Sequence, residues 1–299
     1  MTRPAGTARA PSLGRDALSG RLETSLRDLD QRDGPVTQWK RAWLLTALGR
    51  YGDALEACDQ AAAGSPDIQA CSQMTRAMLY RQISLHHLAE ETDADALDLL
   101  QSATVRVPSI RAAIRIGQVA DAVGLGLDAT VMSRRLQVAA AAVTAAGSWR
   151  QGVRLTWVRG EVHMVRGQFN RAARVFAGGA KVASGQGAVR HQAKSMIFLA
   201  AARAGAGEQD EALRIAERGL QLAARCGAAP LMWPAELILA EVDPDRAETH
   251  LARARQFLEG ILDTLPSELR DEALRQSPAN WLVAGAPPSG SGPTPATDA

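Results

Sequence analysis

The stretch "GQFNRAARVFAGGA", residues 167–180, decides the fold of this chain. Its first glycine stands five residues before an alanine, with the aromatic Phe169 between them, and Gly179 follows that alanine after seven residues. A glycine readily adopts the left-handed backbone that ends one helix and opens a turn. Small residues two helical turns apart let the backbone of a neighbouring helix approach closely. The stretch therefore predicts the turn and the second helix of a helical hairpin.

The same skeleton recurs along the chain, in "GRYGDALEACDQAAAGSP" at 49–66 and in "GEQDEALRIAERGL" at 207–220. Aligned on the alanine that follows each turn, the units fall at Ala54, Ala96, Ala129, Ala172, Ala212 and Ala247. A single hairpin of this length cannot bury its apolar face, so neighbouring hairpins must stack. We predict an all-α fold, an α-solenoid of about six antiparallel helix hairpins over residues 13–285.

The composition agrees with a helical protein and excludes several classes of function. Alanine, leucine and arginine lose little conformational freedom in a helix and are abundant, whereas there are only four Phe and two Tyr. A net charge of +2 is too balanced to indicate a nucleic-acid partner. The three cysteines stand apart, which argues against a zinc site or a disulfide framework. No secretion signal or membrane-length apolar run is present, so we expect a soluble, cytoplasmic protein without a membrane partner.

The units resemble the tetratricopeptide repeat (TPR) family of helical-repeat proteins, in a bacterial, actinobacterial-like form. The stretch at 49–66 matches the family's turn and second helix closely, and the stretch at 167–180 matches nearly as well. At 207–220 the turn aromatic is replaced by Gln209. The resemblance covers residues 35–265, and its long spacing is similar to helical arrays of bacterial transcriptional regulators. It implies a curved superhelix in which the first helix of each unit lines a concave groove.

Four segments lie outside the repeats. Residues 1–12 and 286–299 are rich in Pro, Gly, Ser and Thr and are predicted to be disordered. A helix at about 14–30 precedes the array. The stretch "LPSELRDEALRQSP" predicts a capping helix with Ser267 as N-cap and Pro278 as its end. The charged outer face of this helix is expected to close the apolar end of the stack.

No motif in the sequence indicates catalysis. The Gly-x-Gly pairs lack the spacing and the lysine of a phosphate-binding loop, and no nucleophile, zinc-protease or Cys/His pattern occurs. In "HHLAEE" at 86–91, each histidine lies four residues before a glutamate. The two pairs occupy different helix faces, which indicates local charge pairing rather than a metal site. We therefore expect no enzyme activity, no metal and no cofactor.

The TPR resemblance places a candidate partner-binding wall on the first helix of each unit. Carried over unit by unit, its positions are Trp39, Lys40, Trp43, Arg81, Arg111, Arg115, Arg154, Trp157, Glu161, Lys194, Phe198, Met232, Trp233 and Glu236. Aromatic and methionine side chains suit apolar anchors, and Arg and Lys hold carboxylates. The asparagines with which chaperone-binding members clamp a carboxyl terminus are missing. We expect Arg154, Trp157, Lys194, Phe198 and Trp233 to form one connected patch.

Such a wall predicts a non-enzymatic scaffold that holds a protein partner through a peptide or helix of acidic and apolar character. Three alternatives stay open at this point. The tryptophans can pack between helices while the arginines face solvent, because one residue of register error turns a side chain by about 100°. The groove can belong to a regulator that senses a peptide or small molecule and changes shape. An enzyme would need converging titratable groups, which the sequence does not show. The sequence names neither the partner nor the oligomeric state.

Overall fold

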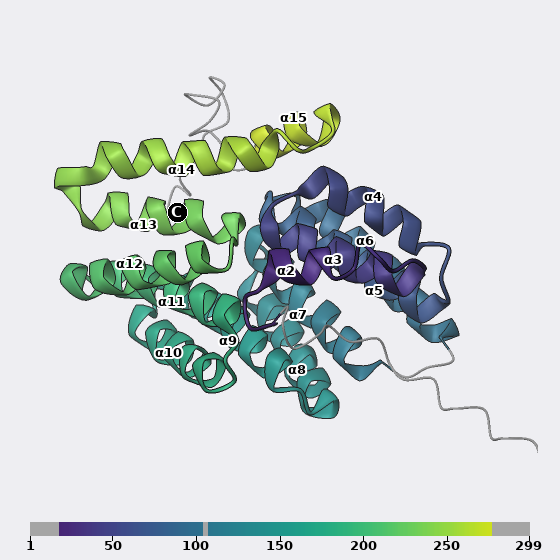
Figure 1. Ribbon diagram of the computed structural model, residues 1–299. Coiled ribbons are helices and arrows are strands. Elements are labelled where there is room, and N and C mark those ends of the chain that lie inside the picture. The colour runs from purple at the N-terminus through teal and green to yellow at the C-terminus, as the bar shows by residue number, and fades with distance from the viewer. Residues whose placement is uncertain (1–17, 104–106, 277–299) are drawn as a thin grey trace, which may run out of the picture.

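The computed structural model describes residues 18–103 and 107–276, and all regular structure in this part of the chain is helical (Figure 1). The first helices of the units are α3 (Pro35–Leu48), α5 (Pro66–Gln82), α7 (Pro108–Gly124), α9 (Trp149–Met164), α11 (Val189–Gly205) and α13 (Ala229–Val242). The second helices are α4 (Tyr51–Ala61), α6 (His86–Ser102), α8 (Ala129–Ala146), α10 (Phe169–Gly185), α12 (Gln209–Arg225) and α14 (Ala247–Leu262). A short helix, α2 (Leu22–Arg27), precedes them, α15 (Ser267–Gln276) follows them, and a 3₁₀ turn, Pro244–Arg246, joins α13 to α14. The predicted array of six helix hairpins is confirmed.

The first helices pack on one another as well as on their hairpin partners. α3 contacts α5, α5 contacts α7, and the series continues through α9 and α11 to α13. α13 in turn contacts α3. The first helices therefore form a closed circuit, a feature that the curved superhelix implied by the TPR resemblance does not specify.

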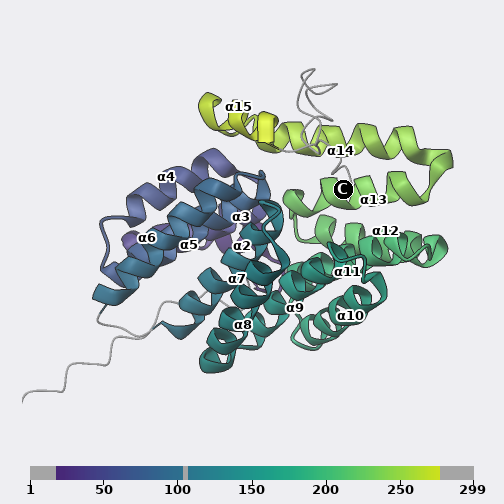
Figure 2. The ribbon, with the colours of Figure 1, turned by 180° about the vertical axis from the view of Figure 1, so that it is seen from behind.

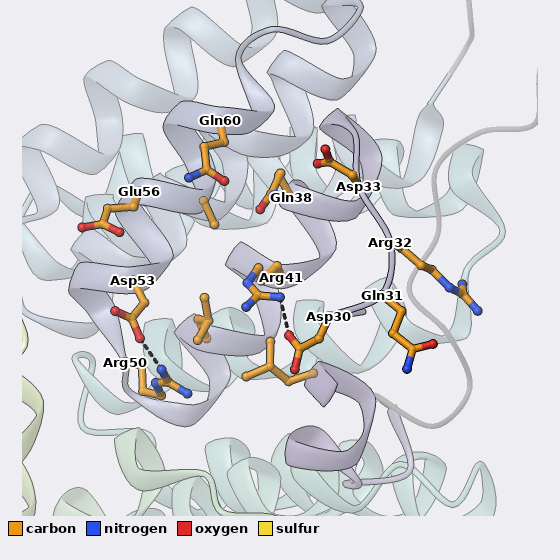
Figure 3. Close-up of a pocket in the computed structure, with 13 residues that line it drawn as sticks. Asp30, Gln31, Arg32, Asp33, Gln38, Arg41, Arg50, Asp53, Glu56 and Gln60 are labelled. Atoms are coloured by element: carbon orange, nitrogen blue, oxygen red, sulfur yellow. Dashed lines mark hydrogen bonds and ion pairs between the residues drawn. The ribbon is translucent and has the colours of Figure 1, made fainter. Parts of the chain in front are cut away.

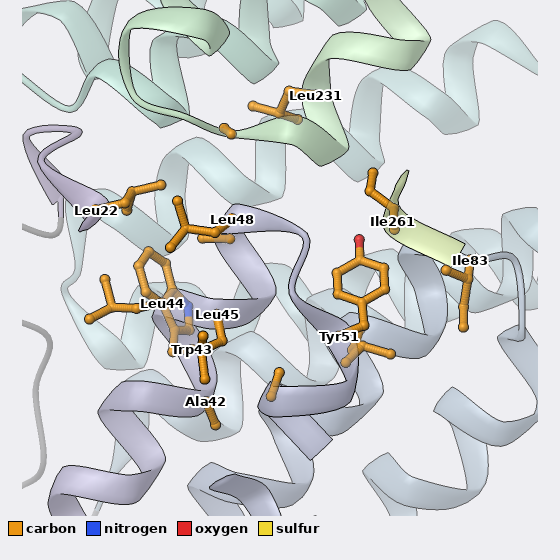
Figure 4. Packing of buried hydrophobic residues seen from close by; sticks show 14 of the residues in the cluster. Leu22, Ala42, Trp43, Leu44, Leu45, Leu48, Tyr51, Ile83, Leu231 and Ile261 are labelled. Atoms are coloured by element: carbon orange, nitrogen blue, oxygen red, sulfur yellow. The ribbon is translucent and has the colours of Figure 1, made fainter. Parts of the chain in front are cut away.

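An apolar cluster joins the two ends of the array (Figure 4). Leu22, Trp43 and Tyr51 from the N-terminal helices pack there with Leu231 and Ile261 from the C-terminal ones. Full burial of a large apolar side chain stabilises a fold by roughly 1.5–3 kcal/mol. Several such side chains together favour closure strongly.

The last helix crosses from one end of the array to the other. Figure 2 shows α15 beside α4, seen from behind. The backbone N–H of Tyr51, at the start of α4, donates to Thr264 Oγ1 at 3.0 Å. His87 on α6 lies 2.8 Å from the carboxylate of Glu272 on α15. The predicted cap thus covers apolar surface of both ends at once and does not close an open end.

The ends of the chain differ from expectation in detail. The N-cap of α15 is Pro266, and Ser267, the expected N-cap, is already helical. The carbonyl oxygen of Pro266 accepts a hydrogen bond from the N–H of Arg270 at 3.0 Å. α2 covers only part of the helix expected at 14–30, of which residues 14–17 lie outside the described residues. The predicted disordered segments 1–12 and 286–299, and the predicted end at Pro278, also lie outside them.

The three strongest repeats lie in the predicted register. Ala54, Ala172 and Ala212 each occupy the fourth position of a second helix and are fully buried. The glycines five residues before them have φ angles of 89°, 66° and 82°. These left-handed turns carry the chain from the first helix of each hairpin into the second.

The second repeat is shifted by seven residues, because its turn carries no glycine. Ser84, with φ 65°, takes the left-handed position, and it is the one non-glycine residue with positive φ in the described chain. The buried alanine that follows is Ala89 rather than Ala96. Seven residues are close to two helical turns, so the error leaves side chains on nearly the same face.

The third and sixth repeats are shifted by three residues. The fourth helical position is Met132 in α8 and His250 in α14, whereas the sequence alignment used Ala129 and Ala247. Three residues turn a side chain by about 60° from its expected direction on a helix of 3.6 residues per turn. This error moves predicted wall residues of these units away from the interior.

The packing of α10 makes a testable prediction. A Cβ atom at Gly179 would lie 2.3 Å from Thr156 Oγ1 on α9, whereas a Cβ at the adjacent Gly178 would meet nothing within 4 Å. We expect Gly179→Leu to lower the free energy of unfolding by roughly 1–3 kcal/mol through overpacking. Gly178→Leu should leave it unchanged or raise it by up to about 1 kcal/mol, through helix propensity. Denaturant unfolding of both variants checks this, and equal effects would contradict the packing.

Candidate functional site

The first helices enclose a cavity of about 210 Å³, which we call the inner groove. Residues of α5, α7, α9 and α11, together with the start of α6, line it. Its charged, imidazole and indole side chains are those of Arg81, His86, Arg150, Arg154, Trp157, Glu161, Arg190, His191 and Lys194. Apolar and small residues such as Ile116, Ala120 and Val158 complete the lining. A concave site of this composition is where a ligand binds most readily.

One part of the lining is an ion cluster that is neutralised within the protein. The guanidinium of Arg81 donates three bonds of 2.8–3.0 Å to Asp121 and also pairs with Asp93. His86 Nδ1 lies 3.1 Å from Asp121. Gly117 on α7 leaves room for this arrangement, since a Cβ there would lie 2.5 Å from the guanidinium of Arg81. The cluster holds α5, α6 and α7 together.

The charges of this cluster are balanced. Burial raises the pKa of Asp93 to about 7, and the Asp121 carboxylate adds to the rise while Arg81 opposes it. Near neutral pH Asp93 is thus partly protonated, and Arg81 lies between it and the Asp121 carboxylate. Arg81 is therefore fully compensated before any ligand arrives.

Lys194 lies between aromatic rings and an acid. Its Nζ is 4.8 Å from the centroid of Trp157 and 5.2 Å from that of Phe198. Burial lowers the pKa of Lys194, and the attraction of Glu161 opposes this. Burial also raises the pKa of Glu161, against the attraction of Lys194. These two groups compensate each other across α9 and α11.

Three arginines of the inner groove make no ion pair in the described chain. Within residues 18–103 and 107–276, no ion pair joins Arg150, Arg154 or Arg190 to an Asp or Glu. Arg154 donates to the amide oxygen of Gln151 at 3.0 Å, and Arg150 Nε donates to His191 Nε2 at 3.2 Å. Arg190 is only 6% exposed, and its buried Nε has no hydrogen-bond partner.

The surroundings of these arginines are aromatic and cationic. The guanidinium carbons of Arg150 and Arg190 lie 5.3 and 5.9 Å from the ring centroid of Trp43. Burial lowers the pKa of Arg150 to about 9 and that of Arg154 to about 10, and the neighbouring arginines add to both shifts, while the Asp93 carboxylate opposes the shift of Arg154. Burial lowers the pKa of Arg190 as well. Cation–π contacts recover only about 0.5–2 kcal/mol each, and several perturbed groups around one cavity mark a candidate binding site.

The structure brings together five of the fourteen predicted wall residues. Arg81, Arg154, Trp157, Glu161 and Lys194 all line the inner groove. They come from the second, fourth and fifth units. In the fourth and fifth units the predicted register is correct. In the second unit it is shifted by seven residues, which is close to two helical turns and keeps side chains on nearly the same helix face. Whether they bind a partner stays a prediction.

The tryptophans are placed differently from the prediction. Trp39 and Trp43 are buried in the core, and Trp39 Nε1 donates to Thr75 Oγ1 at 3.2 Å. Trp157 is only 6% exposed, and its indole N–H donates to Ser195 Oγ at 2.8 Å. Trp39 and Trp157 pack between neighbouring helices, and Trp43 packs in the cluster that closes the array, so the expectation that these rings present open aromatic anchors is wrong.

The remaining predicted residues lie elsewhere. Lys40 is half-buried outside the inner groove, Arg111 is exposed, and Arg115 bonds to Gln118 at 2.8 Å. Phe198 stacks on Phe176 at 5.1 Å and touches the groove only through Lys194. In the sixth unit Met232 and Trp233 pack against the closing cluster, and Glu236 is buried against His250 at 2.5 Å. Trp233 is thus absent from the expected patch, because the three-residue shift and the closure place it, half-buried, against the closing cluster.

The sequence analysis missed Arg150, Arg190 and His191. Arg150 and Arg190 stand four residues before Arg154 and Lys194, on the same helix faces. This i, i+4 spacing could have extended the predicted wall by one turn. The histidines at 86–91 also pair differently from the expectation, since His86 lies against Asp121 and His87 against Glu272.

A larger hollow of about 770 Å³ lies at the surface between the α2–α3 connection and α4 (Figure 3). Four of its charged side chains pair with one another: Arg41 lies 2.7 Å from Asp30, and Arg50 pairs with Asp53. These side chains are largely exposed, so water already screens them. The inner groove, with buried and uncompensated charges, is the stronger candidate.

Other kinds of site are not evident in the part of the chain that the structure describes. There, no group of three His, Cys, Asp or Glu side chains could hold a metal ion, and no helix is long and apolar enough to cross a membrane. The three cysteines are buried. Burial raises their thiol pKa values, to about 12 for Cys71, which makes them poor nucleophiles.

The fold and the inner groove define a TPR-like helical-repeat protein with a charged interior. The solved structure of a Rap protein complexed with competence and sporulation factor is similar to this chain, with a TM-score of 0.57. The match has 14% sequence identity and covers 86% of this chain and 78% of the Rap chain. At this identity the similarity establishes the architecture. No protein-family model and no curated protein matches the sequence.

Proposed function

We propose that this protein is a non-enzymatic regulator that binds an acidic peptide in the inner groove. The observation that carries the proposal is a set of three cations that make no ion pair with a carboxylate in the described chain: the buried Arg154 and Arg190 and the half-buried Arg150. Keeping such charges buried is costly unless a counter-charge can reach them. A peptide with acidic side chains supplies this counter-charge, and the apolar lining of α7 and α9 receives its apolar side chains.

The architecture supports a regulator more than a passive scaffold. The Rap structure, with its bound competence and sporulation factor, is an example of a similar array holding a regulatory ligand. In this chain, α5 and α7 face α9 and α11 across the inner groove, within a closed circuit of helices. A ligand that contacts both sides would change how these helices pack, and closure would transmit the change to α13 and α3. A scaffold that binds without this change is the second candidate.

Two synthetic peptide pools test the proposal. One pool combines Asp and Glu with Leu and Phe, and the other replaces the acids by Lys and Arg. We expect the acidic pool alone to bind in fluorescence polarisation, and more weakly as salt rises. Arg154→Gln should weaken this binding at least tenfold, a loss of about 1.4 kcal/mol, whereas Arg174→Gln on the exposed face of α10 should not.

Equal binding of both pools, or full binding by Arg154→Gln, would overturn the proposed site. Hydrogen exchange then separates the regulator from the scaffold. A regulator should show altered protection in α13 and α3 when the peptide binds, because these helices close the circuit. Protection confined to the helices that line the groove would favour the scaffold.

A further inference from the structure

The cations of the inner groove fall into two groups, compensated and uncompensated, and the proposed function does not explain this difference. Arg81 is compensated by two aspartates, and Lys194 is attracted by Glu161. Arg150, Arg154 and Arg190 make no ion pair in the described chain, and of the three only Arg154 is attracted by a carboxylate, that of Asp93, which Arg81 already engages. The uncompensated charge is therefore concentrated where α9 and α11 approach each other and α3.

Two buried donors on residues that line the inner groove have no hydrogen-bond partner, and Trp43 Nε1, behind the guanidinium groups, is a third. The first is Arg190 Nε. The second is His191 Nδ1: burial and the surrounding cations lower the pKa of His191 well below its usual value, so the ring is neutral. Because His191 Nε2 accepts from Arg150 Nε, the ring proton must lie on Nδ1. Buried donors are nearly always satisfied in folded proteins, so two orphans beside one cavity call for an acceptor.

We propose that Arg150, Arg154 and Arg190 form an oxyanion site that anchors a ligand group carrying two negative charges. The inference rests on the proposed function for the use of the inner groove and names the anchor within it. A dianion matches the charge better than a single carboxylate, since three cations converge on the cavity. The planar guanidinium forks suit either a phosphoryl group or two adjacent carboxylates, such as an acidic side chain next to a peptide carboxyl terminus.

The local packing prepares this site. Trp43 underlies Arg150 and Arg190, with its ring 5.3 and 5.9 Å from their guanidinium carbons, and so limits their movement. Trp149 and Trp157 flank His191, with ring centroids 6.0 and 5.5 Å away. The cavity, about 210 Å³, is several times the roughly 30 Å³ that a water molecule occupies in the liquid. An anion held here meets donors that the surrounding aromatic rings have already oriented.

Small anions test this site without any peptide. The full chain is titrated at pH 7.5 and constant ionic strength with phosphate, malonate, acetate or chloride. Saturation of the wild-type protein by a dianion should raise the melting temperature by about 4 °C, because the anion binds only the folded state. Acetate and chloride should produce no saturable rise. Phosphate alone would identify a phosphoryl anchor, and malonate a paired-carboxylate anchor.

Arg190→Gln and Arg150→Gln should abolish the dianion effect. Each removes a charge that repels its neighbours, so both variants should fold, with an unchanged or raised melting temperature in chloride. Arg174→Gln on α10 should behave as the wild-type protein. Identical responses to all four anions, or a dianion effect that persists in both groove variants, would overturn the proposal.

The result is separable from that of the peptide experiment. Peptide binding without a dianion effect would leave the proposed function intact and remove the anchor. A dianion effect without peptide binding would keep the anion site and overturn the assignment of a peptide ligand.

Discussion

Asp121→Ala is expected to produce the largest loss of stability of any single substitution proposed for this protein. Asp121 has no solvent-exposed surface and accepts three hydrogen bonds from Arg81, whose side chain is 12% exposed. Removal of one partner from a buried ion pair leaves the other charge uncompensated and typically costs about 3–5 kcal/mol. Asp93 offsets part of this cost, because loss of the Asp121 carboxylate lowers its pKa and favours its charged form. We therefore expect about 3 kcal/mol.

Denaturant unfolding measures this loss, with Asp95→Ala as the control. Asp95 lies on the exposed face of α6, and its removal should change the free energy of unfolding by less than about 0.5 kcal/mol. The double variant Arg81→Met/Asp121→Leu should regain at least half of the loss, because it removes both charges and leaves Asp93 able to stay protonated. A loss below 1 kcal/mol for Asp121→Ala would show that the cluster is less buried than the structure indicates.

Gly52→Val is expected to open the closed circuit of helices. A Cβ at Gly52 would lie 2.2 Å from the carbonyl oxygen of Thr264, and a backbone atom cannot move aside without displacing its segment. The substitution should cost about 1–3 kcal/mol through overpacking. The N–H of Tyr51 should also lose its bond to Thr264 Oγ1. We expect faster hydrogen exchange in α14 and α15 than in the wild-type protein.

The matched control is Gly260→Val on α14, where a Cβ would meet nothing within 4 Å. It should leave stability unchanged or raise it slightly, since valine enters a helix more readily than glycine. Equal exchange rates in wild-type protein and Gly52→Val would mean that the contact between α4 and the 263–265 turn does not hold the circuit closed.

The sequence by itself determined the helical class and the repeat. Helix propensity is a property of each residue and its neighbours, and the turn glycines before Ala54, Ala172 and Ala212 act within a single hairpin. Where the turn used Ser84 in place of glycine, the local signal vanished and the register slipped by seven residues. A shift of seven residues keeps side chains on nearly the same helix face. The prediction that Arg81 faces the groove therefore agrees with its position in the lining of the inner groove.

Only the tertiary structure decided which wall residues face a cavity. Packing between neighbouring units buries Trp39, and the cluster that closes the array buries Trp43 of α3, which lies against Arg150 of α9 and Arg190 of α11. Whether a buried cation has a counter-charge also depends on the fold. Asp121 pairs with Arg81 although forty positions of sequence separate them, whereas no acid in the described chain pairs with Arg190. Sequence periodicity reports the face of one helix on which a side chain lies. Burial and charge balance depend on distances between helices, which are established only when the ends of the array pack together.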